Sequence, residues 1–193
     1  MQLQKKFLIY PIAITLALLF TGTAAWYKFS FEERKKLDQI IPTLGKAGST
    51  HAHASMLMFI GGNAVNFCEP RFMLKSQFVH FEDNNCRVIH KHATGVTLPI
   101  FFKTIGVELT DTCITLPFNG EKHCSDDTRK LRVVVNGAEV SVADLTYYEL
   151  RNNDHILVNY GTEEGGMLRF KYNQVPAIPL DINEPLSPEP VLE

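Results

Sequence analysis

The residues of this chain best suited to chemistry are its histidines, because of where they gather. Five of the seven come before residue 93, and four of those five form two pairs with one residue between the partners. Alternate side chains of a β-strand share a face, so His90 and His92 would project together from backbone positions about 6.6–6.8 Å apart. Imidazole nitrogens bind zinc at about 2.0–2.1 Å, in sites with three or four protein ligands. The sequence therefore predicts a metal site with these candidate ligands: His51, His53, His80, His90 and His92.

The participation of His80 depends on the length of one hairpin loop. Residues 83–85 (Asp-Asn-Asn) form a turn between two predicted strands. A three-residue loop would pair Glu82 with Cys86 and place His80 on the same face as His90, whereas a two-residue turn would move His80 to the opposite face. The metal hypothesis requires the odd-length loop. In that register Glu82 is either a ligand or a carboxylate that orients a ligand ring.

The spacing does not identify the metal, because copper and zinc both accept imidazole ligands. Met56 and Met58 lie near the first histidine pair and would favour copper(I), but they alternate with apolar residues and are expected in the core. The glutamate that follows an HxH pair in catalytic cupins is absent after His92. In the alternative interpretation the histidines are exposed or bond sheet-edge carbonyls, and the domain is a metal-free binding or assembly module.

The four cysteines allow three pairings. Cys113 and Cys124 bracket a turn-rich segment, which favours a bridge across that hairpin, and Cys68 with Cys86 is the complementary pair. Disulfides persist in oxidising compartments, so this interpretation favours an exported domain. Two alternatives stay open: a Cys86 thiolate as a metal ligand, and thiol–disulfide exchange at Cys113 and Cys124.

Other chemistries have little support in the sequence. Lys and Arg number 19 against 21 Asp and Glu, which excludes the strongly basic composition typical of nucleic-acid binders. No GxSxG, P-loop or HExxH motif is present. His123 fits a loop position, and His155 fits the start of a strand.

Turn signals divide residues 51–172 into short strands around one helix. Thr97 caps a helix over 98–105, Pro99 occupies its first turn, and Gly106 ends it. This helix is nearly all apolar and should lie buried against the sheet. The predicted fold class is α+β, a largely antiparallel sheet with one short buried helix. Strands are expected over 56–60, 64–67, 77–82, 86–92, 107–109, 113–116, 131–135, 139–142 and 156–160.

Residues 7–27 carry no charge and are long enough, at about 1.5 Å per residue, to cross the roughly 30 Å hydrocarbon core of a bilayer. Trp26 and Tyr27 stand at the far end, where aromatic residues favour the interface. The alternative is a cleaved signal peptide with small residues at 23–25, although the apolar run is longer than usual for one. The lysines and arginines on the two sides leave the orientation open, and the cysteines favour export of the domain.

The predicted organisation is thus a short tail (1–6), a single-pass anchor in the lipid bilayer (7–27) and an extracytoplasmic domain (51–172). Residues 28–50 are predicted to form a juxtamembrane helix and a linker. Residues 173–193 are acidic and rich in proline, which is typical of an extended or disordered tail.

The stretch 97–161 resembles the second half of a β-grasp domain, as in the small sulfur-carrier proteins. The matching features are a helix ending in Ile105-Gly106, the strand LRVVVNGAEV, and the segment YELRNNDHILVNYG with Leu150, Asp154 and Ile156. The resemblance implies a β-grasp-like fold. The carriers end in a free Gly-Gly, whereas 27 residues follow Gly165-Gly166 here, so it does not imply carrier chemistry.

The longer span 51–161 is similar to a group of uncharacterised, membrane-anchored prokaryotic proteins. These carry one HxH pair after the anchor and a second in an IHxHATG motif, which stands here at residues 89–95. Some members are described as disulfide-isomerase-like, but this sequence lacks the CxxC of such enzymes. Together these features predict an anchored domain that binds copper or zinc through its histidines. A metal-free assembly module and a thiol–disulfide protein are the alternatives.

Overall fold

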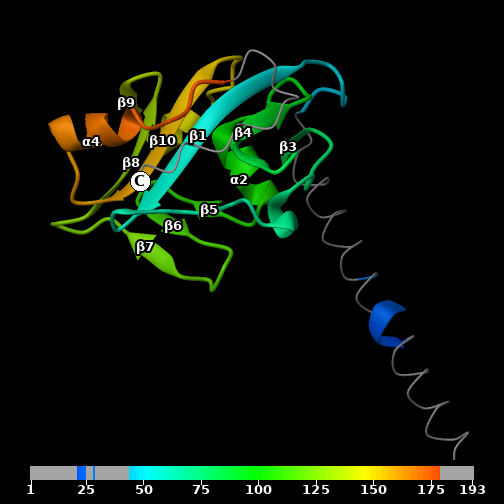
Figure 1. The fold of residues 1–193 in the computed structure, drawn as a ribbon, viewed down its shortest axis with the longest axis horizontal. Helices are drawn as coiled ribbons and strands as arrows, with labels where there is room; N and C mark the ends of the chain where they lie inside the picture. Colours follow the sequence, from blue (N-terminus) through cyan, green and yellow to red (C-terminus); the bar gives the residue numbers. More distant parts are fainter. Residues whose placement is uncertain (1–20, 25–27, 29–43, 179–193) are drawn as a thin grey trace, which may run out of the picture. The chain divides into compact units, whose positions relative to one another are not determined.

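The structure is a computed structural model that describes residues 21–24, 28 and 44–178. Residues 21–24 are helical, and residues 44–178 contain the sheet-rich part of the chain (Figure 1). Among the described residues, no helix is long and apolar enough to span a membrane. Most of the predicted anchor (7–27) and of the predicted juxtamembrane helix lies outside the described residues, as does the tail beyond residue 178.

The main sheet has strand order β3-β4-β1-β10-β8-β9, with the short β2 also paired to β1 (Figure 1). The central strands β1 and β10 run parallel, and the other neighbours in this sheet are antiparallel. A second, three-stranded sheet has the order β5-β6-β7. The bounds of the main-sheet strands are β1 Ala52–Ile60, β2 Asn63–Ala64, β3 Val79–Glu82, β4 Asn85–Lys91, β8 Lys130–Val135, β9 Ala138–Val140 and β10 Asp154–Gly161. Those of the second sheet are β5 Glu108–Leu109, β6 Cys113–Thr115 and β7 Lys122–Cys124.

The predicted α+β class with a mostly antiparallel sheet is confirmed, but the expectation of a single helix is wrong. The predicted buried helix is α2 (Leu98–Thr104), and residues 44–178 contain three further short helices: η1 (Pro70–Phe72), α3 (Val142–Leu145) and α4 (Gly165–Tyr172). Helix α4 begins with two glycines, which disfavour helix on propensity alone. It forms because tertiary packing overrides that local preference.

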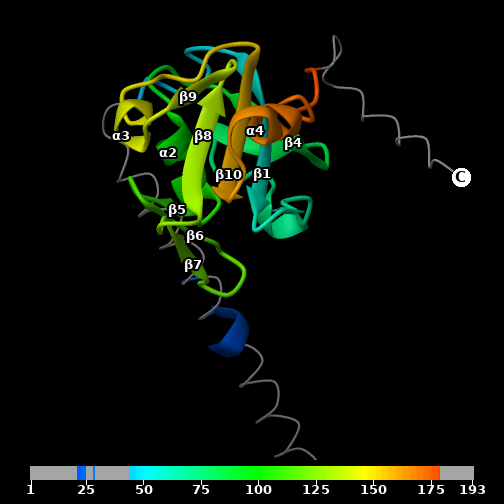
Figure 2. The same ribbon diagram turned by 90° about the vertical axis from the view of Figure 1, so that its left-hand side faces the viewer.

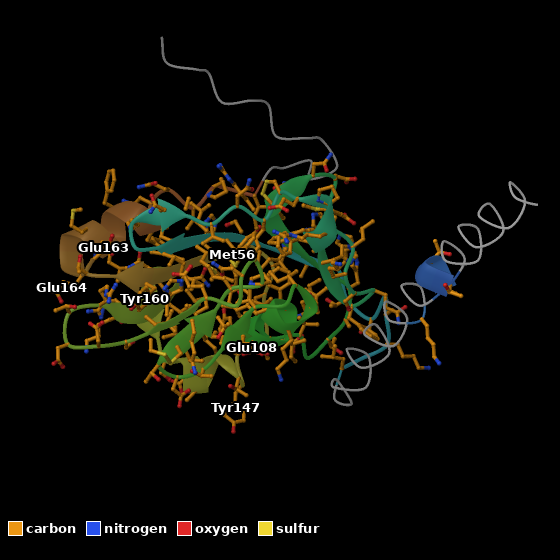
Figure 3. All side chains as sticks on the ribbon, turned by 90° about the horizontal axis from the view of Figure 1, so that it is seen from below. Met56, Glu108, Tyr147, Tyr160, Glu163 and Glu164 are labelled. Atoms are coloured by element: carbon orange, nitrogen blue, oxygen red, sulfur yellow. A yellow bond between two sulfur atoms is a disulfide. The ribbon has the colours of Figure 1, made fainter. Side chains whose placement is uncertain are left out.

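The larger core lies on one face of the main sheet. Alternate residues of the two central strands, among them Met56 and Ile156, point into it and are almost fully buried. Helix α2 covers this face with Phe101, whose ring meets the ring of Phe81 on β3 edge to face at 4.9 Å. Figure 3 shows Met56 inside this layer of side chains, whereas Tyr147 points away into solvent and is 88% exposed.

Helix α4 covers part of the opposite face, where it lies over β10 (Figure 2). Leu168 of the helix and Val175 just beyond it pack against Phe59 of β1 and Leu157 of β10, which alternate with the residues that face the larger core. The two central strands are therefore apolar on both faces, as expected of parallel strands covered on both sides. Farther along the same face, the starts of β1 and β10 carry polar side chains, those of His53, Ser55 and His155.

Both predicted disulfides are confirmed, Cys68 with Cys86 and Cys113 with Cys124. Cys113 and Cys124 lie directly opposite each other on β6 and β7. Cys86 lies on β4 and Cys68 lies before η1, so their bond closes the loop that contains η1 and β3. Because Cys86 is in a disulfide, the alternative of a Cys86 thiolate ligand is wrong.

Replacing both cysteines of the first bridge, Cys68→Ser with Cys86→Ser, is expected to lower the free energy of unfolding by about 3 kcal/mol. The bond restricts an unfolded loop with a sequence separation of 18 residues, and loop-closure entropy sets that magnitude. Urea unfolding of the variant and of the oxidised wild type measures the difference. The matched pair Cys113→Ser with Cys124→Ser should cost slightly less, because its separation is 11 residues. Equal stability of wild type and first variant would contradict the expectation.

Candidate metal centre

Three neighbouring strands place one histidine each in a single row across the main sheet. His53 on β1 is the register partner of His90 on β4, and His90 is in turn the partner of His80 on β3. Cross-strand partners in a sheet point to the same face. The row therefore projects from the face opposite the larger core, beyond the part that α4 covers.

The two remaining candidate histidines are His51 and His92. Each lies two residues along the chain from a member of this row, His53 or His90, and therefore projects from the same face. The ring centroid of His51 lies 4.6 Å from that of His53 and 5.0 Å from that of His92. The ring of His92 lies 5.0 Å from the ring of His80, and that of His53 lies 4.8 Å from His90. The structure thus brings together all five histidines that the sequence singled out, in one contiguous group called here the histidine cluster.

The hairpin that carries His80 adopts neither of the two predicted loops. Its turn has two residues, Asp83 and Asn84, both with left-handed φ (53° and 57°), and Glu82 pairs with Asn85. Left-handed φ at both positions is typical of the tight type I′ turn. A register shift between His80 and Glu82 then changes the phase of the two strands, so that His80 lies opposite His90. His80 therefore reaches the face that the metal hypothesis requires by way of a β-bulge.

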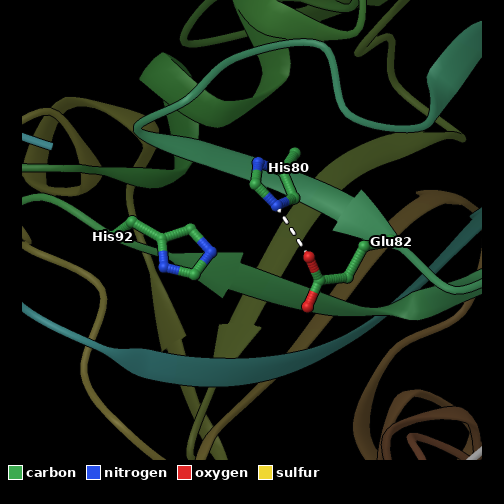
Figure 4. Close-up of side chains that lie close together, drawn as sticks. All are labelled: His80, Glu82 and His92. Carbon is green, nitrogen blue, oxygen red and sulfur yellow. Dashed lines mark hydrogen bonds and ion pairs between the residues drawn. The ribbon is translucent and has the colours of Figure 1, made fainter. Parts of the chain in front are cut away.

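Glu82 lies between two of the rings, with one carboxylate oxygen toward each. Its Oε2 is 3.0 Å from Nε2 of His80, and its Oε1 is 2.8 Å from Nδ1 of His90. Figure 4 shows the first of these contacts. It also shows the ring of His92, which follows the last residue of β4, turned toward the same carboxylate. Ligand atoms of His80, Glu82 and His92 all lie within 4.8 Å of one another, so this group can hold a metal ion.

The ring of His80 is oriented by a backbone carbonyl. Its Nδ1 donates a hydrogen bond to the carbonyl oxygen of Ser76 at 2.6 Å. When the ring is neutral, Nε2 therefore carries the lone pair, and this lone pair faces the Glu82 carboxylate. Two acceptors in contact require a proton or a cation between them. A histidine that donates one nitrogen to a carbonyl and presents the other to a ligand position is also typical of metal sites.

His90 has an unpaired nitrogen in the most buried part of the cluster. Its side chain is 1% exposed, and Nδ1 has no hydrogen-bond partner, although the Glu82 oxygen is only 2.8 Å away. The two atoms are close, but the ring nitrogen and the carboxylate oxygen are not aligned as donor and acceptor of a hydrogen bond. A buried polar atom without a partner costs about 1–3 kcal/mol. A cation bound beside the Glu82 carboxylate would relieve that cost.

The environment favours the neutral form of three of the rings, those of His53, His90 and His92, and the charged form of Glu82. Burial lowers the pKa of His53 from 6.5 to about 4, and the like charge of neighbouring histidines adds to the effect. Burial also lowers the pKa values of His90 and His92. Burial alone would raise the pKa of Glu82, but its hydrogen bond with His80 and the nearby rings bring it below the usual value. Neutral imidazole and ionised carboxylate are the forms that bind metal ions.

The lowered pKa of His53 predicts an acid-sensitive fold when metal is removed. The unfolded chain takes up this proton near pH 6.5, whereas the folded chain resists it down to about pH 4. The contribution of His53 to the free energy of unfolding is therefore fully present above pH 6.5 and is lost as the pH falls toward 4. Urea unfolding across this range in the presence of a chelator measures the slope. His53→Gln should flatten it, and an equal slope in both proteins would contradict the prediction.

Two features of the site escaped the sequence analysis. Ser55, which is fully buried on β1, contacts Nδ1 of His155 on β10 through its hydroxyl at 3.2 Å, so a sixth histidine borders the cluster. The placement of His155 could have been predicted from the alternation of β10, since Ile156 and Val158 point into the core and His155 must therefore face the opposite side of the sheet. The role of the Ser76 carbonyl had no signal in the sequence, because it arises from backbone position.

The methionines behave as expected for core residues. Met56 and Met58 are each 1% exposed and point into the larger core, on the face opposite the histidine cluster. Thioether ligation of copper(I) by these residues is therefore excluded in this fold. Comparison with known proteins adds no assignment: no protein family, curated protein or solved structure matches this chain.

Proposed function

We propose that the chain is a membrane-anchored, extracytoplasmic protein whose folded domain binds a transition metal ion, copper or zinc. The observation that carries this proposal is the convergence of His80, Glu82 and His92, whose ligand atoms lie within 4.8 Å of one another. His90 lies beside this group, since its buried Nδ1 is 2.8 Å from the second oxygen of Glu82.

The donor set fits zinc and copper(II). Two imidazole nitrogens and one carboxylate oxygen match the three protein ligands of zinc sites that leave the fourth position to water. Magnesium and calcium prefer sites made entirely of oxygen ligands. Sulfur ligands, which select copper(I), are unavailable in the cluster because all four cysteines are paired and the nearby methionines face the core.

The proposed role is metal handling or metal-supported stability of the hairpin formed by β3 and β4. Both strands contribute ligands, so an ion would join the edge strand β3 to the sheet through His80, Glu82 and His92. The carbonyl of Ser76 orients the ring of His80, and the lowered pKa values of His92 and Glu82 favour the forms of these side chains that bind metal ions. Metal binding to a folded site of this kind adds directly to folding stability.

Three observations support the finer parts of the proposal. The two disulfides fit an oxidising compartment outside the cytoplasm. The uncharged run at 7–27 and the IHxHATG motif support anchoring as in the similar prokaryotic group. A β-grasp-like fold is supported by the sheet itself. Parallel β1 and β10 lie at its centre, antiparallel β4 and β8 flank them, and α2 packs on one face.

Metal content of the full-length, tag-free chain tests the proposed function. After incubation with Zn²⁺ or Cu²⁺ and removal of free metal, the wild type should retain bound ion, and His90→Ala with His92→Ala should lose it. His123→Ala is the matched control, because His123 lies on β7 of the second sheet, outside the cluster. Equal metal content in the wild type and the double variant would reject the site.

A further inference from the structure

We infer that the histidine cluster has a second transition-metal site, formed by His51 and His53 beside the site at His80, Glu82 and His92. Nε2 of His51 lies 3.0 Å from Nε2 of His53. His51 is exposed and His53 half-buried, so this second site faces solvent. It rests on the proposed function only in having the first site as its neighbour, because its own two ligands are different residues.

The separation of the two nitrogens is the one that a shared ion requires. Two ligands that each lie about 2.0–2.1 Å from one ion are about 2.9–3.4 Å apart, for bond angles between a right angle and a tetrahedron. The observed 3.0 Å falls within that range. A hydrogen bond between two neutral rings gives a similar separation, and the experiment below distinguishes the two.

The backbone holds this pair in place. The amide of His53 donates to Oδ1 of Asn152 at 3.0 Å, and the carbonyl of His53 accepts from the amide of Asn153 at 2.8 Å. The turn before β10 therefore fixes the start of β1, where the two rings project from one face. Ligands fixed by backbone hydrogen bonds need less ordering when they bind an ion.

One ion cannot use all the donors of the cluster. Five imidazoles and one carboxylate exceed the four ligands of a zinc site. The convergent group of His80, Glu82 and His92 does not include His51 or His53. The ring of His92 stands between the two groups, 5.0 Å from the ring of His51 and 5.0 Å from that of His80. The surplus donors thus form a separate group next to the first.

The two sites should differ in affinity and exchange. The inner site has three protein donors, one of them a carboxylate, whereas the outer site has two imidazoles and leaves its remaining positions to water or an exogenous ligand. Repulsion between neighbouring cations further weakens the second binding step. The outer ion is therefore the more weakly bound and the more rapidly exchanged, as suits an ion that enters from solvent.

Metal titration of the full-length, tag-free chain tests this inference. With Zn²⁺, equilibrium dialysis of the wild type should give two ions per chain in two affinity classes at least about tenfold apart, because the bound inner cation repels the second. With Cu²⁺, electron paramagnetic resonance should show coupling between two neighbouring ions. His51→Ala with His53→Ala should retain the tight ion and lose both the weak ion and the coupling. His123→Ala should match the wild type.

The remaining outcomes separate this inference from the proposed function. His80→Ala with Glu82→Gln should lose the tight ion and keep the weak one. A single ion in the wild type, weakened by both double variants, would overturn the second site and retain the first. Two ions that persist in His51→Ala with His53→Ala would overturn the second site as drawn. One ion lost only on replacing His51 and His53 would instead overturn the inner site, and no bound ion in any protein would overturn both.

Discussion

Glu82→Gln is expected to abolish the stabilisation that a Zn²⁺ or Cu²⁺ ion bound at His80, Glu82 and His92 gives to the folded chain. An ion that binds only the folded state at a free concentration 100 times its dissociation constant raises the free energy of unfolding by about 2.7 kcal/mol. Glutamine keeps the size of the side chain but removes its charge. The two oxygens of Glu82 lie 3.0 Å from a nitrogen of His80 and 2.8 Å from a nitrogen of His90. The substitution therefore removes a negative charge from the centre of the site.

The same substitution should change the metal-free protein little. Glu82 is partly exposed, and ion pairs at such positions contribute about 0–1 kcal/mol. A large effect with metal and a small effect with chelator is therefore the signature of a ligand, because a merely structural residue would change both. Affinity for the ion should fall at least about 100-fold, since loss of even an outer-shell partner commonly costs 10- to 100-fold.

Thermal and urea unfolding with added metal and with chelator measure both quantities. Glu108→Gln is a suitable control, because Glu108 is an exposed glutamate on β5 of the second sheet. The control should retain the full metal-dependent increase in stability. If Glu82→Gln retained that increase as well, Glu82 would not be a ligand.

Asp154→Ala is expected to lower the free energy of unfolding by at least about 1–3 kcal/mol, the cost of one buried donor left without its acceptor. Asp154 is 2% exposed at the start of β10. Its Oδ1 accepts from Nδ2 of Asn136 at 2.8 Å and from the hydroxyl of Tyr148 at 2.9 Å, and its Oδ2 accepts from the amide of Arg151 at 2.7 Å. Alanine would leave these donors without their acceptor.

Asp154 also joins three parts of the chain that meet at the start of β10. Asn136 belongs to the turn between β8 and β9, Tyr148 follows α3, and Arg151 precedes the strand. Burial, followed by the hydrogen bond to Asp154, raises the pKa of Tyr148 to about 12. Asp154→Ala should therefore also return this pKa toward 10, which the absorbance of tyrosinate reports.

Urea unfolding of Asp154→Ala against Asp127→Ala measures the stability effect. Asp127 is exposed in the loop before β8, so its replacement should change stability by no more than about 0.5 kcal/mol. Asp154→Asn should fall between the two, because an amide oxygen still accepts but one of the acceptor positions becomes a donor. An alanine variant as stable as the wild type would contradict the assigned role.

Several features of this chain followed from local sequence alone. Helix α2 was predictable because Pro99 and Gly106 mark its two ends and the residues between are mostly apolar, but the predicted cap is wrong, since the Thr97 side chain makes no capping hydrogen bond. The two disulfides were predictable because Cys113 and Cys124 bracket a hairpin, which leaves Cys68 for Cys86. Helix α4 was not, since two glycines open it and its formation depends on packing against β1 and β10.

For the site, the sequence by itself determined which residues are candidate ligands and that the two members of each HxH pair share a face, because side chains of a strand alternate with period two. Only the tertiary structure decided that the two pairs meet. His53 stands beside His90 because β1 pairs with β4, and His80 joins them because a bulge corrects the phase of a two-residue turn. The pairing of β1 with β4 joins segments that are distant in the chain, and local residue patterns mark neither this pairing nor the bulge in the β3–β4 hairpin.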